Sequence, residues 1–346
     1  MATISVCMIV KDEAENLGPC LDCLKDFVEE IIIVDTGSKD DTKEIARQYT
    51  DQVYDFLWTG NFSEARNFAF SLASMEYIYS ADADERIDPK NQERFRLLKA
   101  ALLPEVEIVQ MRYANQLENG CVYNFDEEYR PKLFKRLRTF RWASPIHETI
   151  VTSPVIFDSD IIIGHFPKSP HGARDLAIFR RASEQNPLDS RLQHMYAMEL
   201  YLAGELEDLL LARPYFENEI KSDKRTLDET AEARCILARA ARLAGDTDSF
   251  YHTALLGVVG SPCAELCCEI GEFYLSRRAY EDAIPWFSHA IENAACLLVA
   301  KACGSWPMEG LAKCWDALGN PEQAHYWKDS AKAWNPGMLE KNHSVR

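Results

Sequence analysis

The chain has no long apolar run and no basic leader. Its N-terminus, "MATISVCMIVKDEAEN", holds only a short apolar segment before Lys11. A signal peptide has a basic start, and a membrane span needs roughly 20 apolar residues. We therefore expect a cytoplasmic protein without stable membrane insertion.

Basic residues are scarce. The 346 residues include 38 Lys and Arg against 55 Asp and Glu, a formal net charge of −17. Because nucleic acids are bound through cations that neutralise phosphates, this balance argues against a nucleic-acid partner. One basic run stands out. Its alternation is typical of a solvated strand face, although it is also suited to an acidic acceptor or a diphosphate. The run consists of Lys132, Lys135, Arg136, Arg138 and Arg141.

Cysteine spacing of the zinc-binding type is also missing. Cys20 and Cys23 form a C-x-x-C, but no second pair follows at zinc-site spacing. The group Cys263, Cys267 and Cys268 has no histidine at ligand spacing. Since no secretory signal is present, the eleven cysteines are expected to be reduced thiols.

Strand and helix patterns alternate through the first hundred residues. Continuous apolar segments of the strand type are separated by segments with apolar residues at helical spacing. Such strands predict a largely parallel sheet that is covered on both faces and binds ligands at its carboxyl ends. The expected strands are 4–10, 30–38, 52–56 and 77–85, and the expected helices are 12–27, 39–49 and 63–74. Further strand-like segments at 106–115, 132–142 and 155–166 should extend the sheet.

Polar residues follow three of these strands, and the third set is the most acidic. In "YIYSADADERID", Asp82 and Asp84 lie one residue apart, and Glu85 comes next. Two neighbouring carboxylates at a strand end repel each other unless a cation compensates them. A hard-oxygen site for Mg²⁺ or Mn²⁺, completed by substrate phosphates, would supply that cation. The alternative is a solvated turn that caps the following helix.

Strand signals stop near residue 170, so we expect one domain over 1–170 and a second over 171–346. In the second domain, turn-like segments at Gly204, Gly245, Arg278 and Gly319 are spaced by 41, 33 and 41 residues. A period near 34 is typical of tetratricopeptide helix pairs. The alternative is a helical bundle whose aromatic residues are simply core.

Four ordered segments carry a resemblance to a known family. They are "SVCMIVKDEAENLGPCLD", "EIIIVDTGSKDDT", "FSEARNFAF" and "YIYSADADERI". Together they resemble family-2 glycosyltransferases of the GT-A fold, in particular the subgroup with C-terminal tetratricopeptide-like helices. That subgroup includes bacterial enzymes that glycosylate peptides on sulfur or oxygen. The resemblance implies an α/β GT-A domain with a Rossmann-like mixed sheet, followed by an all-α repeat domain.

Two details of the resemblance matter. The residues before the D-x-D motif are usually an apolar pair, and here they are Ser80 and Ala81. A fainter match, "FRWASPIHETI", is similar to a segment of lipopolysaccharide-core glucosyltransferases.

The resemblance implies a donor site for a nucleotide sugar. Asp35 would contact the uracil or ribose, and Arg66 the uracil or diphosphate, since a guanidinium suits paired oxygens. The alternative for Arg66 is an ion pair with Glu64 or Asp55. The full set implied for the donor is Val10, Glu13, Asp35, Arg66, Asp82 and Ala83.

The resemblance also implies a metal site and a catalytic base. Asp84 would ligate Mn²⁺ or Mg²⁺, with His165 as a further ligand, and Asp84 is counted with the catalytic residues. Glu148 would take the acceptor's proton, with His147 beside it. The alternative for His165 is a purely structural role. For His147 and Glu148, the alternatives are a core imidazole and a salt bridge at a strand edge.

These inferences predict an inverting hexosyl- or N-acetylhexosaminyltransferase that uses UDP-Glc or UDP-GlcNAc. The expected acceptor is a Ser, Thr or Cys side chain of a peptide or protein presented by the helical repeats. A lipopolysaccharide-core or other glycan acceptor is the second hypothesis. The third, from another class, is a repeat-based binding module with an inactive transferase domain. The sequence leaves open whether the chain forms a homodimer.

Overall fold

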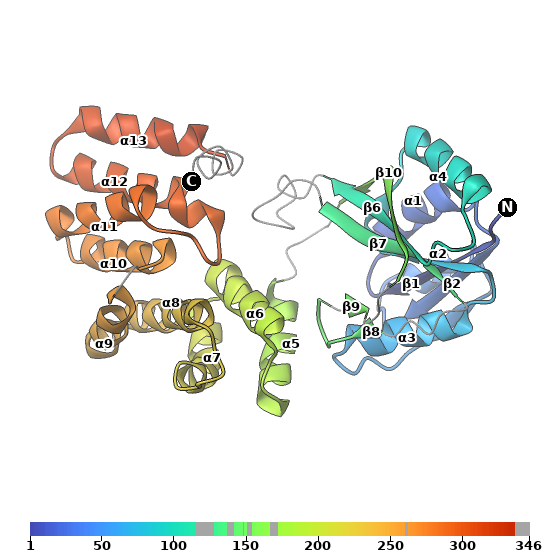
Figure 1. The fold of residues 1–346 in the computed structure, drawn as a ribbon, viewed down its shortest axis with the longest axis horizontal. Coiled ribbons are helices and arrows are strands. Elements are labelled where there is room, and N and C mark those ends of the chain that lie inside the picture. Colours follow the sequence, from blue (N-terminus) through green and yellow to red (C-terminus); the bar gives the residue numbers. More distant parts are fainter. Residues whose placement is uncertain are drawn as a thin grey trace. The chain divides into compact units, whose positions relative to one another are not determined.

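The computed structural model describes residues 1–114, 128–136, 142–147, 149–150, 154–166, 172–259 and 262–335. The chain forms two compact units, Met1–Pro170 and His171–Arg346. Figure 1 shows that the first contains a sheet with helices on it and that the second is helical.

The first unit is built on a mixed sheet in the order β3-β2-β1-β4-β7-β6-β10-β5. Neighbouring strands among β1 to β4 pair in parallel, as expected, whereas β7 is antiparallel to both β4 and β6. The strands are β1 (Ile4–Val10), β2 (Glu30–Asp35), β3 (Val53–Asp55), β4 (Tyr77–Ala81), β5 (Glu85–Arg86), β6 (Ile108–Ala114), β7 (Glu128–Lys135) and β10 (Ile156–His165). A separate pair is formed by β8 (Trp142–Ala143) and β9 (Thr149–Ile150).

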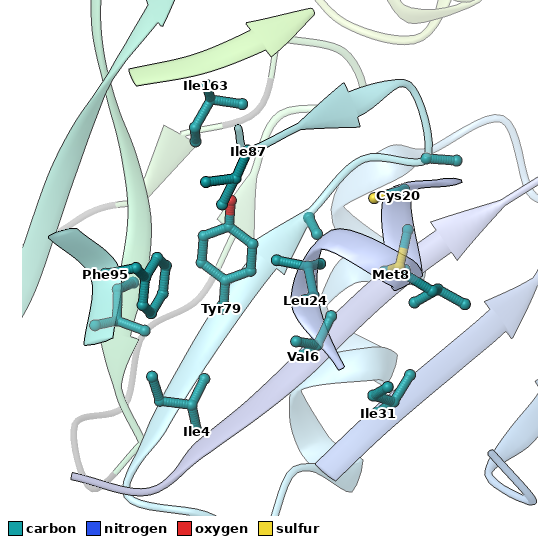
Figure 2. Packing of buried hydrophobic residues seen from close by; sticks show 14 of the residues in the cluster. Ile4, Val6, Met8, Cys20, Leu24, Ile31, Tyr79, Ile87, Phe95 and Ile163 are labelled. Carbon is teal, nitrogen blue, oxygen red and sulfur yellow. The ribbon is translucent and has the colours of Figure 1, made fainter. Parts of the chain in front are cut away.

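Helices cover both faces of this sheet. Apolar residues of α1 (Ala14–Leu24) and α4 (Pro89–Ala101) pack on one face. On that face, Figure 2 shows the ring of Tyr79 beside Phe95, with ring centres 5.4 Å apart. α2 (Thr42–Ala46) buries Ala46 in the same cluster. α3 (Phe62–Leu72) lies on the other face, where Ala69 and Phe70 contact a smaller core.

Local signals fix where these helices begin. The side chain of Asp88 accepts a hydrogen bond from the backbone of Asn91, and Pro89 occupies the first turn of α4. Asn61 caps α3 in the same way by accepting from Glu64. Such caps satisfy backbone donors that have no partner within a helix. The loops that carry polar side chains are therefore held at defined positions between strand and helix.

The second unit consists of helices in its described residues. They are α5 (Gly172–Gln185), α6 (Ser190–Ala203), α7 (Leu206–Glu219), α8 (Leu227–Ala244), α9 (Thr247–Val258), α10 (Ala264–Ser276), α11 (Tyr280–Glu292), η1 (Ala300–Cys303), α12 (Ser305–Ala317) and α13 (Pro321–Ala333). The predicted turns fall between α6 and α7, α8 and α9, α10 and α11, and α12 and α13. The expected helical repeats are confirmed.

Packing explains the small-residue pattern of these repeats. A Cβ added at Gly271 of α10 or at Gly310 of α12 would lie 2.6 or 2.5 Å from the ring of Phe287. The two glycines therefore let the ring of α11 lie against both neighbouring helices. Gly245 has a φ of 72° and ends α8 in the left-handed conformation that favours glycine.

Two expectations from composition can be compared with the structure. The ten cysteines within the described ranges are free thiols, as expected. In the same ranges, no helix is both long and apolar enough to cross a membrane.

Candidate functional site

The polar strand ends meet at one edge of the sheet. β2, β1 and β4 are adjacent and parallel, with Val10 paired to Asp35 and Met8 paired to Ala81. The loops after these strands hold Glu13, Ser38 and Asp82. A crevice outside the carboxyl ends of parallel strands is where open α/β sheets bind ligands. The candidate site lies there.

Asp35 ends β2 with its side chain almost completely buried. Its Oδ1 accepts hydrogen bonds from the backbone N–H groups of Gly37 at 2.9 Å and Ser38 at 3.0 Å. Lys43 Nζ lies 3.7 Å from the same oxygen. Oδ2 is buried and has no hydrogen-bond partner among the described residues. A buried carboxylate oxygen without a donor is costly, so it favours a hydrogen-bonding ligand at this point.

Val10 and Glu13 flank this turn. The carbonyl of Val10 accepts hydrogen bonds from the backbone and hydroxyl of Thr36, at 3.0 and 3.1 Å. The backbone of Glu13 donates to Thr42, and its carboxylate accepts from the amide of Asn16 at 3.0 Å. These bonds tie the first loop to the second. Glu13 thus has a fixed position beside the strand ends.

Asp82 is bound by a cation from α3. Arg66 donates to Oδ1 of Asp82 at 3.4 Å and to the hydroxyl of Ser80 at 2.7 Å. Its guanidinium also lies over the ring of Trp142, 5.0 Å from the ring centre. These contacts give a role to Ser80, which stands where the family usually has an apolar residue. A hydroxyl there accepts a hydrogen bond that an apolar side chain cannot.

Asp84 and His165 are brought together. Nε2 of His165 lies 3.0 Å from Oδ2 of Asp84, and both side chains are largely buried. The pairing of β5 with β10 places Glu85 opposite His165, and the backbone N–H of Phe166 donates to the carbonyl of Asp84. Ala83, between the two aspartates, is buried and accepts from Arg86 through its carbonyl at 2.9 Å.

Lys132 is buried, although the sequence predicted that it lies on a solvated strand face. The basic run was expected to form a solvated face, but Lys132 of β7 is only 4% exposed. It donates to the carbonyl of Ser80 at 3.3 Å and to Oδ2 of Asp82 at 3.4 Å, and it forms an ion pair with Glu85. Tyr113 of β6 donates to the same oxygen of Glu85. Arg138 and Arg141 of the run lie outside the described residues.

The surroundings shift the pKa values of Asp82 and Glu85 in opposite directions. Burial opposes the ionisation of Asp82, but the nearby cations of Lys132 and Arg66 hold its pKa well below its usual range. Burial raises the pKa of Glu85 to about 7, and the charge of Asp82 adds to that shift, although Lys132 opposes it. Asp82 is therefore ionised at neutral pH.

The carboxylate of Asp84 and the imidazole of His165 suit a divalent cation whose remaining ligands come from a substrate. In the described part of the chain, no three His, Cys, Asp or Glu side chains gather as a ready metal site. Asp84 and His165 offer one oxygen and one nitrogen at one point. Mg²⁺ and Mn²⁺ are commonly held by one or two carboxylates together with substrate phosphates and water. The pair fits that arrangement.

The predicted catalytic base cannot be placed. Glu148 lies outside the described residues. His147 is exposed and has a φ of 47° in the turn between β8 and β9. This turn is attached to α3, because Ser144 and Pro145 accept hydrogen bonds from Ser63 and Phe62. The catalytic roles of both residues stay predictions.

Sequence reasoning missed Lys132 and Tyr113. Alternation along the strand does not place Lys132, because the pairing of β6 with β7 is irregular at this residue: Val109 pairs with Leu133 and Gln110 with Pro131. Nothing in the sequence links Tyr113 to Glu85, because the hydrogen bond depends on β6 lying next to β10.

Comparison with known proteins agrees with this architecture. Residues 5–162 match the family described as glycosyl transferase family 2. A TPR repeat-containing protein of Synechococcus elongatus is 46% identical over 152 residues, which cover 43% of this chain and 36% of that protein. The SPbeta prophage-derived glycosyltransferase SunS of Bacillus subtilis is 36% identical over 92 residues, covering 26% of this chain and 22% of SunS.

Among solved structures, glucosyl-3-phosphoglycerate synthase from Mycobacterium tuberculosis, in complex with Mn²⁺ and UDP-glucose, is similar with a TM-score of 0.37 and 15% identity. That similarity covers 53% of this chain and 78% of the synthase. The chain thus spans about a third or less of the length of the two sequence relatives. Residues 5–162, which make up most of the first unit, match glycosyl transferase family 2, and helical repeats follow them.

Proposed function

We propose that the protein is a metal-dependent, inverting glycosyltransferase that moves a sugar from a UDP-sugar to a side chain of a peptide or protein. The observation that carries this proposal is the set of charged groups at the strand ends of a family-2 domain. Arg66 contacts Asp82 at 3.4 Å, and His165 contacts Asp84 at 3.0 Å.

The donor side is supported by the partners of each residue. The buried Oδ2 of Asp35 is suited to accept a hydrogen bond from the uracil or ribose. Arg66 is held in place by Ser80 and Asp82, and a guanidinium at this point is suited to bind a diphosphate oxygen. Asp82 would accept from the ribose or sugar, with the backbone of Val10 and Ala83 and the side chain of Glu13 closing the nucleotide site.

Asp84 and His165 would hold Mn²⁺ or Mg²⁺. When bound, the ion supplies positive charge that stabilises the leaving nucleoside diphosphate. The chain's own contribution is to fix the two ligands, through the pairing of β5 with β10. Arg66 adds a second positive group from α3 on the opposite side of Asp82 from Lys132.

The acceptor side rests on the helical unit and on the turn between β8 and β9. Stacked helix pairs form extended surfaces that suit peptides. Glu148 would take the proton from the acceptor hydroxyl or thiol as the new bond forms at the anomeric carbon, with His147 beside it. The proton then resides on Glu148 while UDP leaves with the electron pair of the broken bond.

The test measures UDP released from UDP-Glc and UDP-GlcNAc by the full chain, with Mn²⁺ and with EDTA. Activity that disappears with EDTA and in Asp84→Asn is expected. Asp160→Asn serves as the matched control, since its carboxylate belongs to the same unit and is 75% exposed. No release from either donor under any condition would contradict the proposal and favour a binding module.

A second assay identifies the acceptor. Candidate peptides and lipopolysaccharide-core glycans are incubated with the donor that is hydrolysed, and products are found by mass spectrometry. A mass increase of one sugar on Ser, Thr or Cys supports a peptide acceptor. Transfer to the glycan alone would replace it with the second hypothesis.

A further inference from the structure

Lys132 of β7 places a buried ammonium among the acidic residues of the loop after β4, which comprises Asp82, Asp84 and Glu85. Its side chain is 6% exposed, and its ammonium contacts both Asp82 and Glu85. Burying an ammonium is costly unless it is paired with charge and hydrogen bonds. Here the carbonyl of Ser80 completes its shell at 3.3 Å. These three acceptors, together with the ring of Tyr113 whose centre lies 5.1 Å from the ammonium, offset the cost of this burial.

Two cations balance two of the three carboxylates in this loop. Arg66 and Lys132 contact opposite oxygens of Asp82, at 3.4 Å each. Lys132 also pairs with Glu85, whose side chain is 2% exposed and accepts a further bond from Tyr113. Asp84 differs from them in that it contacts an imidazole, that of His165 on β10, at 3.0 Å.

The two aspartates of the D-x-D motif therefore have different partners: Asp82 contacts two cations, and Asp84 contacts an imidazole. A metal ion that bound Asp82 would have to lie close to two fixed positive charges. Coulomb repulsion from these two cations disfavours a divalent ion at Asp82. Asp84 and His165 instead contact each other, as one carboxylate and one imidazole 3.0 Å apart.

We infer that Lys132 is a positioning residue, which keeps Asp82 out of the metal's coordination shell and oriented as an acceptor for the donor. The inference rests on the proposed function for the donor, and it goes further by giving β7 a part in the site. Lys132 acts through Asp82 and is not itself a catalytic residue.

A purely structural role makes a different prediction. If Lys132 served only to balance Glu85, removing both partners together would restore the site. Removing one partner of a buried ion pair leaves an uncompensated charge, whereas replacing both can be nearly neutral. The double variant Lys132→Met/Glu85→Gln therefore separates the two roles. It removes both members of the buried ion pair, and it leaves Asp82 without its ammonium.

The first experiment uses Mn²⁺ alone as the probe, with free Mn²⁺ measured by electron paramagnetic resonance. It compares the wild type with Lys132→Met, Lys132→Arg and the double variant, and thermal unfolding monitors the fold of each. We expect the double variant to bind Mn²⁺ on the order of tenfold more tightly than the wild type, because Asp82 becomes a ligand. Lys132→Arg, which retains the charge, should stay near the wild type.

A double variant that melts like the wild type and binds Mn²⁺ no more tightly overturns the inference, whatever the wild-type affinity is. If the single Lys132→Met variant fails to fold, the double variant still decides the matter, because it buries no unpaired charge.

Calorimetry with UDP and Mn²⁺ gives the second readout. The double variant should bind UDP about tenfold more weakly than the wild type, since Asp82 is turned toward the metal. Unchanged UDP affinity overturns the positioning role. A wild type that binds Mn²⁺ but not UDP contradicts the proposed function instead, and the Mn²⁺ comparison still tests the inference.

Discussion

His165 and Asp84 are in contact through Nε2 and Oδ2, 3.0 Å apart, although the two residues belong to different strand ends. The contact exists because β5 runs antiparallel to the last residues of β10. Backbone pairing thus holds a carboxylate oxygen and an imidazole nitrogen at one point. This geometry makes the metal hypothesis specific enough to test by substitution.

Replacing either member of this pair should weaken metal binding. His165→Ala and Asp84→Asn are each expected to lower Mn²⁺ affinity in the presence of UDP by at least about tenfold. Substitutions of residues that support a metal site typically lower metal affinity about 10- to 100-fold. Equilibrium dialysis or calorimetry measures it. His325→Ala is the control, because that imidazole is 78% exposed and pairs with Asp329 in the helical unit. Wild-type Mn²⁺ affinity in His165→Ala would remove His165 from the site.

Asp35→Asn should weaken UDP binding while preserving the turn. The amide oxygen can still accept from Gly37 and Ser38, but the charge and the second acceptor are lost. A hydrogen bond to a charged group contributes about 1.5–3 kcal/mol, so affinity should fall roughly 10- to 100-fold. The matched control is Asp55→Asn, since Asp55 shares Lys43 with Asp35 but is 78% exposed. Equal UDP affinity in the two variants would contradict the assignment.

Arg66→Lys should impair the donor site although it keeps the charge. A lysine cannot bond Ser80 and Asp82 together in a fixed plane while lying flat over Trp142. We expect KM for the UDP-sugar to rise, on the order of tenfold, with unchanged thermal stability. Arg47→Lys, at a side chain 58% exposed, should leave KM unchanged. Steady-state kinetics with UDP-Glc measures KM for both variants. An unchanged KM in Arg66→Lys would argue against a diphosphate contact.

The helical unit should be less stable at high pH because of Glu199. Burial raises the pKa of this carboxyl to about 7, and the charge of Asp175 adds to the shift. Between an unfolded pKa near 4.5 and that value, the folded state holds a proton that the unfolded state has released, so stability falls as pH rises.

Glu199→Gln removes this dependence. The variant should match the wild type near pH 4.5 and exceed its free energy of unfolding at pH 8, on the order of 2 kcal/mol. Urea denaturation followed by tryptophan fluorescence measures it at both pH values. Parallel stability curves for the two proteins from pH 5 to 8 would show that Glu199 titrates normally.

Several features of the site follow from local sequence. The carboxyl ends of buried parallel strands are set by where apolar runs stop, so the positions of Asp35 and Asp82 could be predicted without coordinates. The repeats could be predicted from turns such as Gly245, because a left-handed residue ends a helix regardless of what packs on it. The domain boundary near residue 170, and the roles of the site residues, remain predictions.

Other features depended on tertiary pairing. The period of a strand tells which residues share a face, but it does not tell whether that face is covered, so Lys132 was assigned to solvent. Its burial arises because β7 lies between β4 and β6, where Ser80, Asp82 and Glu85 surround the ammonium.

The sequence by itself therefore determined which chemical groups stand at the strand ends and that helical repeats follow them, since both are encoded by short-range patterns. The tertiary structure alone decided which cation meets which carboxylate. Arg66 and Lys132 reach Asp82 from α3 and β7, and His165 reaches Asp84 from β10. Those contacts join segments far apart in the chain, and only the order of strands in the sheet brings them within range.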